Sequence, residues 1–167
     1  MTKMKGIIFS TPMVQRVLDG TKTMTRRLGK TIFDVGDICY VKETWARLEG
    51  EYLYKADYGE MSTPCYARWK PSLFMPRVAA RIFIRIEEVG IERLQDITEE
   101  DILAEGICMP DRIITYEYTD NIRLMFIALW NTLYRKDTKK QWAANPWVFK
   151  YRFKVLTKEE LQEVGNE

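Results

Sequence analysis

The chain has 167 residues and a mass of 19.8 kDa, with 46% hydrophobic, 13% aromatic and 30% charged residues. This length and composition predict one soluble globular domain with a substantial hydrophobic core. The sequence contains no histidine, which excludes histidine-dependent triads and histidine-based zinc sites.

The net charge of +2 conceals an uneven distribution along the chain. Residues 1–83 carry 14 basic and 8 acidic side chains, a net charge of +6. Residues 84–167 carry 12 basic and 16 acidic side chains, a net charge of −4. This asymmetry could produce one positive face on the folded protein.

The cysteines and the hydropathy of the chain indicate the cellular compartment of the protein. Cys39, Cys65 and Cys108 are an odd number, and they are widely spaced without a CxxC pair, so no disulfide framework or zinc knuckle is expected. No apolar run could span a bilayer, and no signal-peptide pattern opens the sequence. We therefore expect a cytoplasmic protein without a metal, an organic cofactor or a membrane partner. The oligomeric state is not predicted.

The first elements are short. Residues 6–10 (GIIFS) read as a buried strand, and Thr11 offers a cap for a helix with Pro12 at its first position. This helix should stop at Asp19-Gly20 and lead into a polar loop over 20–27, GTKTMTRR.

Strands dominate the next part of the chain. Residues 38–44 alternate apolar and polar side chains, and the irregular stretch 45–76 leaves room for one strand at 52–56. Residues 81–89 alternate more clearly and should form a strand. Its inward face should hold Ile82, Ile84 and Ile86.

Two helices and a final strand follow. Thr98 should cap a helix with an acidic first turn that Gly106 ends, which leaves Glu105 at the unfavourable, C-terminal end of the helix dipole. Residues 122–134 should form a core helix capped at 120 or 121.

The sequence ends with a strand and a tail. Residues 147–155 alternate as a strand, and residues 157–167 should form a polar tail. The order of elements does not fit a doubly wound sheet. It predicts an α+β fold, a mixed and partly closed β-barrel with flanking helices.

The loop 20–27 is the first candidate site because it concentrates cations and hydroxyls suited to binding phosphate. With Lys30, it contributes Lys22, Arg26, Arg27 and the hydroxyls of Thr21, Thr23 and Thr25. The alternative is a solvated loop whose charges only keep the surface soluble.

A second candidate lies between residues 61 and 86, where cations and aromatic rings interleave without an acidic residue. They are Arg68, Lys70, Arg77, Arg81 and Arg85 with Tyr66, Trp69, Phe74 and Phe83. Cations follow a phosphate backbone and rings stack on unpaired bases, so this mixture fits single-stranded nucleic acid. The alternative is a core strand with a basic outer face. Lys150, Arg152 and Lys154 could extend this surface or protect a sheet edge.

Catalysis without histidine is the third candidate. A lysine whose pKa is lowered can act as a base toward a threonine hydroxyl, and a carboxylate can then carry the proton. The candidate set is Lys22, Thr25 and Glu105. The sequence alone does not show that Glu105 approaches the loop.

Several motifs together resemble the ASCH family of the PUA-like superfamily. Residues 20–27 resemble its G-x-K-x-x-S/T-x-R signature, Gly36-Asp37 its GD turn, and residues 94–106 (LQDITEEDILAEG) its T-E-E helix. The segments around Trp45, Trp69, Met75 and Asn145 are similar to ASCH proteins of phages and prophages. The resemblance covers residues 4–156, which implies one domain over 1–156 with insertions near 45–80 and 107–120.

The resemblance also implies a function linked to RNA or modified nucleosides. Small bacterial ASCH enzymes that hydrolyse N4-acetylcytidine use a Lys, a Thr and a Glu at positions that correspond to Lys22, Thr25 and Glu105. Lys22 would take the proton of Thr25, Glu105 would carry a proton to the leaving amine, and Arg27 would hold an oxyanion or phosphate.

Three hypotheses follow. The first is a domain that binds RNA or a nucleoside in a cleft between the GTKTMTRR loop and the Glu105 helix. Its ligand-binding residues would be Thr23, Arg26, Arg27, Trp69, Lys70, Arg77 and Arg81. The second is an amidohydrolase for N4-acylated cytidine that uses Lys22, Thr25 and Glu105. The third is a phage structural or assembly protein.

Overall fold

The fold is built around one mixed β-sheet. The computed structural model describes residues 4–58, 68–108 and 122–165, and its main sheet has the strand order β1-β3-β6-β7-β2. These strands are β1 (Lys5–Ile8), β2 (Met24–Arg27), β3 (Ile38–Lys42), β6 (Phe83–Arg93) and β7 (Trp147–Val155). β1 and β3 run parallel, and the other neighbours are antiparallel. The predicted α+β class is confirmed.

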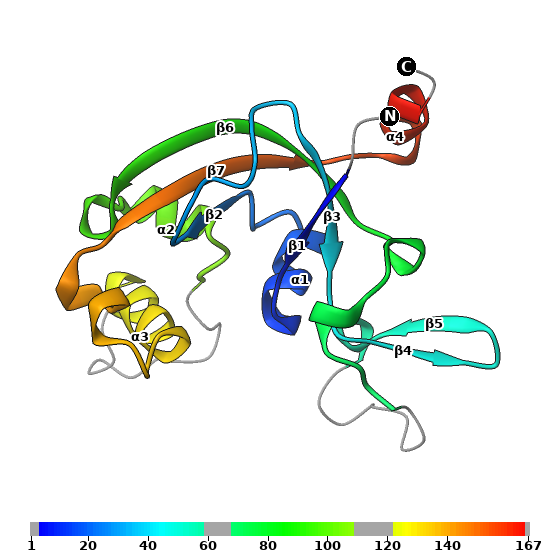
Figure 1. Cartoon of the computed structure of the whole chain (residues 1–167), viewed down its shortest axis with the longest axis horizontal. Coiled ribbons are helices and arrows are strands. Elements are labelled where there is room, and N and C mark those ends of the chain that lie inside the picture. Colours follow the sequence, from blue (N-terminus) through cyan, green and yellow to red (C-terminus); the bar gives the residue numbers. More distant parts are fainter. Residues whose placement is uncertain (1–3, 59–67, 109–121, 166–167) are drawn as a thin grey trace.

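The main sheet is curved but open. Figure 1 shows β6 and β7 as a long arch above α1, and the sheet has β1 and β2 as its edges. A β-bulge between Ile86 and Glu88 adds to the twist of this long strand pair. Because β1 and β2 do not pair with each other in the described residues, closure into a barrel is not confirmed.

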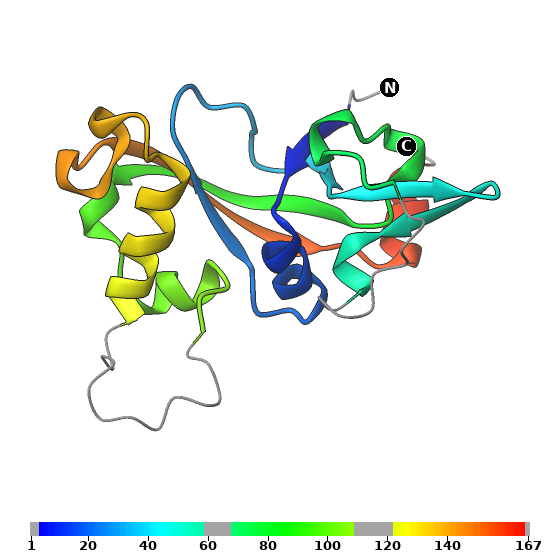
Figure 2. The ribbon, with the colours of Figure 1, turned by 90° about the horizontal axis from the view of Figure 1, so that it is seen from below.

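The α-helices of the described residues lie in three places. They are α1 (Thr11–Leu18), α2 (Glu99–Ala104), α3 (Ile122–Leu133) and α4 (Lys158–Gly165). Figures 1 and 2 place α1 near the middle of the sheet, α2 and α3 toward one end, and α4 near the other. The cap of α1 is Ser10 instead of the predicted Thr11. None of the described helices has the length and hydropathy needed to cross a membrane.

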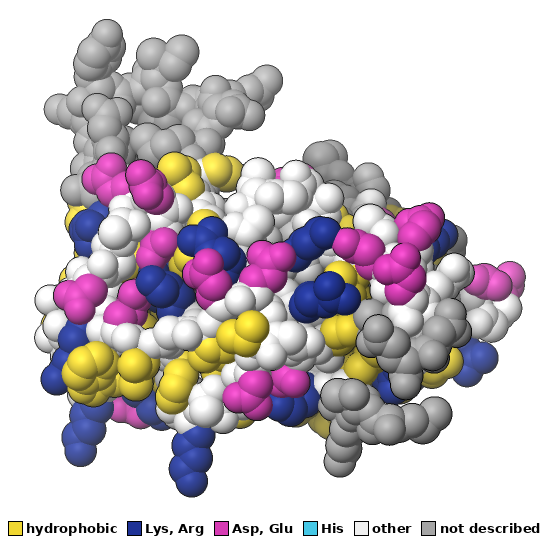
Figure 3. Space-filling model, turned by 90° about the horizontal axis from the view of Figure 1, so that it is seen from above, with side chains coloured by type: hydrophobic (Ala, Val, Ile, Leu, Met, Phe, Trp, Pro, Cys, Tyr) yellow, Lys and Arg dark blue, Asp and Glu magenta, His cyan; other side chains and the backbone are white. Residues whose placement is uncertain are grey.

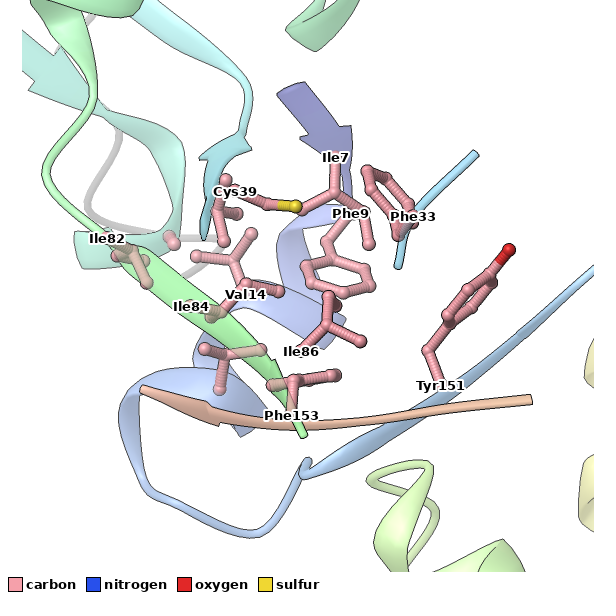
Figure 4. Packing of buried hydrophobic residues seen from close by; sticks show 13 residues of the cluster. Ile7, Phe9, Val14, Phe33, Cys39, Ile82, Ile84, Ile86, Tyr151 and Phe153 are labelled. Atoms are coloured by element: carbon pink, nitrogen blue, oxygen red, sulfur yellow. The ribbon is translucent and has the colours of Figure 1, made fainter. Parts of the chain in front are cut away.

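Two apolar clusters support the sheet. Ile82, Ile84 and Ile86 are at most 4% exposed, as the alternation predicts, and they pack with side chains of β1, α1, β3 and β7. Figure 4 shows these side chains pointing toward one another. The second cluster joins α2 and α3 to the far part of β7. Its members are Leu94, Ile97, Ile102, Ile107, Phe126, Trp130 and Val148.

Two segments contain strands that were not predicted. The end of the expected loop 20–27 is strand β2, because Met24 to Arg27 pair with β7 from Arg152 to Phe149. The irregular stretch after residue 44 contains two strands, β4 (Trp45–Leu48) and β5 (Glu51–Tyr54), where one was predicted. Glu49 and Gly50 join them with positive φ angles of 51° and 96°, which a tight hairpin turn requires.

The polar end of the chain contains helix α4, which the prediction of a tail over 157–167 missed. The backbone N–H of Glu160 donates to the Thr157 hydroxyl, and the N–H of Thr157 donates to the Glu160 carboxylate. This reciprocal pair is a capping box, for which the T-x-x-E spacing is a sequence signal. The predicted cap at 120 or 121, most of the 107–120 insertion, and Cys65 and Tyr66 lie outside the described residues.

Candidate functional site

A cavity of about 350 Å³ lies between β2, α1 and α3. Its polar lining comes from Lys22, Thr25, Arg26, Arg27 and Glu105, together with Ser10, Thr44 and Ser72. The remaining wall is apolar and includes Phe9, Ile107, Phe126, Trp130 and Tyr134. The cavity therefore contacts members of both apolar clusters and brings the three predicted catalytic residues to one surface.

Helix α2 places Glu105 next to Lys22. Thr98 caps α2 by accepting a hydrogen bond from the N–H of Asp101, as the sequence predicts. The helix stops at Gly106, whose φ of 84° suits glycine. A Cβ at Gly106 would lie 3.0 Å from the Cβ of Lys22, so glycine also permits this close approach.

Lys22 is a buried cation with three hydrogen-bond acceptors. Its Nζ donates to the carbonyl oxygens of Met24 and Glu105 at 2.8 Å each, and to Oε2 of Glu105 at 3.0 Å. Burial lowers the pKa of Lys22; Glu105 opposes the decrease, and Arg27 and Arg26 add to it. Its three ammonium hydrogens are thus taken by these acceptors, and it makes no hydrogen bond to Thr25 in the described structure.

Arg26 holds the carboxylates behind the cavity. Its side chain is fully buried, and its guanidinium bonds Glu92 at 2.7 Å, Glu105 Oε1 at 3.2 Å, and Asp101. Burial disfavours the charge, but Glu105, Glu92 and Asp101 outweigh it and raise the pKa of Arg26. Glu105 therefore accepts from Arg26 with one oxygen and from Lys22 with the other, which fixes the orientation of its carboxylate.

Two cavity residues retain unused donors. Thr25 is only 4% exposed, and its hydroxyl makes no hydrogen bond within the described residues. Arg27 donates from one terminal nitrogen to the carbonyl of Ile8 at 2.6 Å, but its buried Nε has no partner there. Burial also lowers the pKa of Arg27, although Glu105 opposes this. A ligand with acceptor oxygens would satisfy both donors.

The other residues predicted to bind a ligand do not line this cavity. The Thr23 backbone ties β2 to its neighbours, because its N–H bonds Ala104 and its carbonyl accepts from Phe153. Trp69 packs against Tyr58, and Lys70 lies 4.8 Å from the ring of Trp45. Arg77 is exposed, and Arg81 pairs with Glu43 and Asp57.

The cations of β7 have acidic partners. Lys150 contacts Glu92 at 2.9 Å, Arg152 contacts Glu88 at 3.3 Å, and Lys154 contacts Glu160 at 2.6 Å. Figure 3, seen from above the β6–β7 arch, shows basic and acidic side chains interspersed on this face. This face is therefore not a continuous basic surface.

Sequence reasoning missed the apolar wall of the cavity. Phe126, Trp130 and Tyr134 follow helical spacing, which indicates only a buried face, and Phe9 lies in a predicted core strand. Their common role depends on α3 meeting β1 and β2 across the cavity. Within the described residues, no group of three or more Cys, Asp or Glu side chains is arranged to hold a metal ion.

Comparison with known proteins shows the fold. A crystal structure of a DUF984 protein from Enterococcus faecalis V583 matches with a TM-score of 0.51 and 14% identity, covering 93% of this chain and 82% of that one. The two proteins share a fold. An ASCH domain from Lactobacillus crispatus JV V101, of the family that the motifs resemble, matches with a TM-score of 0.45 and 16% identity, covering 92% and 80%. No family model and no curated protein matches the chain significantly.

Proposed function

We propose that the cavity binds a nucleoside, either free or as an unstacked nucleotide of RNA. The observation that carries this proposal is that Thr25 and Arg27 line the same cavity as an aromatic wall, and that the buried Nε of Arg27 has no hydrogen-bond partner in the described residues. A flipped or free base needs such a combination, since its faces stack on rings while its edges form hydrogen bonds. A volume of about 350 Å³ lies in the range of small-molecule pockets.

A second candidate function is deacylation of an N4-acylated cytidine. It is favoured by the convergence of Lys22, Thr25 and Glu105, with the Lys22 Nζ 3.0 Å from the Glu105 carboxylate. The lowered pKa of Lys22 favours its neutral amine, which can act as a base.

The chemical step follows from these positions. Neutral Lys22 accepts the Thr25 proton, directly or through water, as the Thr25 oxygen bonds to the acyl carbon. The C–N bond then breaks, and the proton that Lys22 took from Thr25 passes through Glu105 to the leaving amine of cytidine. Water finally hydrolyses the acyl-threonine and restores the hydroxyl. Before this step, the Lys22 amine must break one of its three present hydrogen bonds so that it can reach the Thr25 hydroxyl.

The test combines binding and turnover. Calorimetry with cytidine and N4-acetylcytidine measures binding, and chromatography measures release of cytidine. We expect Thr25→Val to weaken binding about threefold to tenfold, the effect of one lost hydrogen bond, and to reduce any turnover about a thousandfold or more. Thr132→Val is the matched control, because Thr132 is exposed on α3 and does not line the cavity.

The outcomes separate the hypotheses. Binding without turnover leaves the nucleoside-binding function and rejects the deacylase. Salt-sensitive RNA binding without nucleoside binding rejects this cavity as the site. Absence of all three activities favours the phage structural or assembly hypothesis.

A further inference from the structure

The two rims of the cavity differ in chemistry. One rim has the hydroxyls of Ser10, Thr44 and Ser72, and none of these hydroxyls bonds another group in the described part of the chain. The other rim has Leu129 and Leu133 of α3, which are 37% and 64% exposed. In Figures 1 and 2, α3 lies on one side of α1, and the β3–β4 junction that contains Thr44 lies on the other.

The apolar rim continues into the cavity as one stripe of α3. Phe126, Leu129, Trp130 and Leu133 have the spacing i, i+3, i+4 and i+7, which places them on one helix face, and all four line the cavity. Phe126 and Trp130 are each only 4% exposed, whereas the two leucines remain open to solvent. The stripe therefore runs from the buried wall to the outer edge.

We propose that the ligand carries an apolar substituent of several carbons on its base, and that this substituent lies along Leu129 and Leu133. The inference rests on the proposed nucleoside function. The ribose hydroxyls face Ser10, Thr44 and Ser72, and the substituted amine faces Thr25 and Glu105 between the rims. The substituent then covers leucine surface that is otherwise left in contact with water.

N4-alkylcytidines test this inference without interference from turnover, because they contain no amide bond. Calorimetry compares cytidine with its N4-methyl, N4-butyl and N4-hexyl derivatives. We expect the affinity to rise up to about fourfold for each methylene group that leaves water. The double variant Leu129→Ser and Leu133→Ser should remove most of this increase. Leu124→Ser should preserve it, because Leu124 is equally an exposed leucine of α3 but does not line the cavity.

Each way in which the inference can fail gives a different binding result. Equal binding of cytidine and all its derivatives overturns the apolar substituent but leaves the proposed function intact. A chain-length effect that survives in the double variant overturns the position of the substituent on α3. If no nucleoside binds to the folded protein, the proposed function fails, and this inference fails with it. Circular dichroism establishes that each variant is folded.

Discussion

Two arginine–carboxylate clusters stabilise different parts of the molecule. Arg26 is fully buried among three carboxylates behind the cavity. Arg81 contacts both oxygens of Glu43 at 2.9 and 3.0 Å and also pairs with Asp57. The guanidinium of Arg81 lies 4.0 Å from the ring of Tyr54, so its face is covered as well.

The difference between the clusters lies in their neighbours. Beside Arg26, Thr25 and Arg27 line a cavity, and the buried Nε of Arg27 has no partner in the described residues. The donors of Arg81 are engaged with Glu43 and Asp57, and Arg81 does not line that cavity. A cluster of buried charges therefore does not by itself indicate a binding site, and the proposed site rests instead on an unpartnered donor of a residue that lines a cavity. A ligand-binding role for Arg81 stays a prediction, and its ion pairs compete with that role.

Removing Arg26 should have the largest effect on stability. Arg26→Met would leave Glu92, Asp101 and Glu105 without their shared cation, and we expect the free energy of unfolding to fall by about 3–5 kcal/mol. Urea denaturation measures this change. Arg77→Met, at an exposed site, should stay within about 0.5 kcal/mol of the wild type. A loss below about 1 kcal/mol in Arg26→Met would contradict a central role for this cluster.

Arg81→Met should cost less, about 2–3 kcal/mol at pH 7, because Asp57 is exposed to water while Glu43 is not. Burial raises the pKa of Glu43 above 4.5, and Arg81 opposes this increase. Protonated Glu43 needs no cation, so its contribution to stability is present at pH below 4.5 and is lost as the pH rises through the pKa of the folded state. The cost of Arg81→Met should therefore shrink toward pH 4. A cost independent of pH would show that Glu43 is not responsible.

Gly106→Ala tests whether the close approach of α2 to Lys22 matters. The left-handed φ costs about 1–2 kcal/mol for any non-glycine residue, and the new Cβ would also lie 2.9 Å from the Arg16 Cβ. Gly36→Ala is the matched control, since its φ of 90° is similar and its Cβ would meet nothing within 4 Å. Thermal and urea unfolding should show a larger loss for Gly106→Ala. Equal losses would mean that the contact is easily relieved.

The smallest effect is expected at the cap of α2, the helix that presents Asp101 and Glu105 to Arg26. Thr98→Ala should destabilise the protein by about 1 kcal/mol, because the N–H of Asp101 loses its acceptor. Thr98→Ser should restore most of the stability, because serine also caps helices. Failure of serine to rescue would point to the packing of the methyl group instead of the cap.

Much of the fold follows from local patterns. The alternation over 81–89 and 147–155, the cap at Thr98 and the stop at Gly106 all correspond to observed elements. Local patterns did not predict strand β2, because a polar four-residue strand forms only when β7 supplies its hydrogen bonds. A cytoplasmic location and a phage role stay predictions.

The sequence by itself excluded histidine chemistry, and its motifs led to the prediction that Lys22, Thr25 and Glu105 handle protons. It also placed Glu105 at the end of a capped helix, through local signals. Only the tertiary structure decided that Glu105 lies 3.0 Å from Lys22, although 83 residues separate them. It also decided that the α3 stripe faces them across a cavity. Such contacts depend on packing between distant segments, which local propensity does not encode.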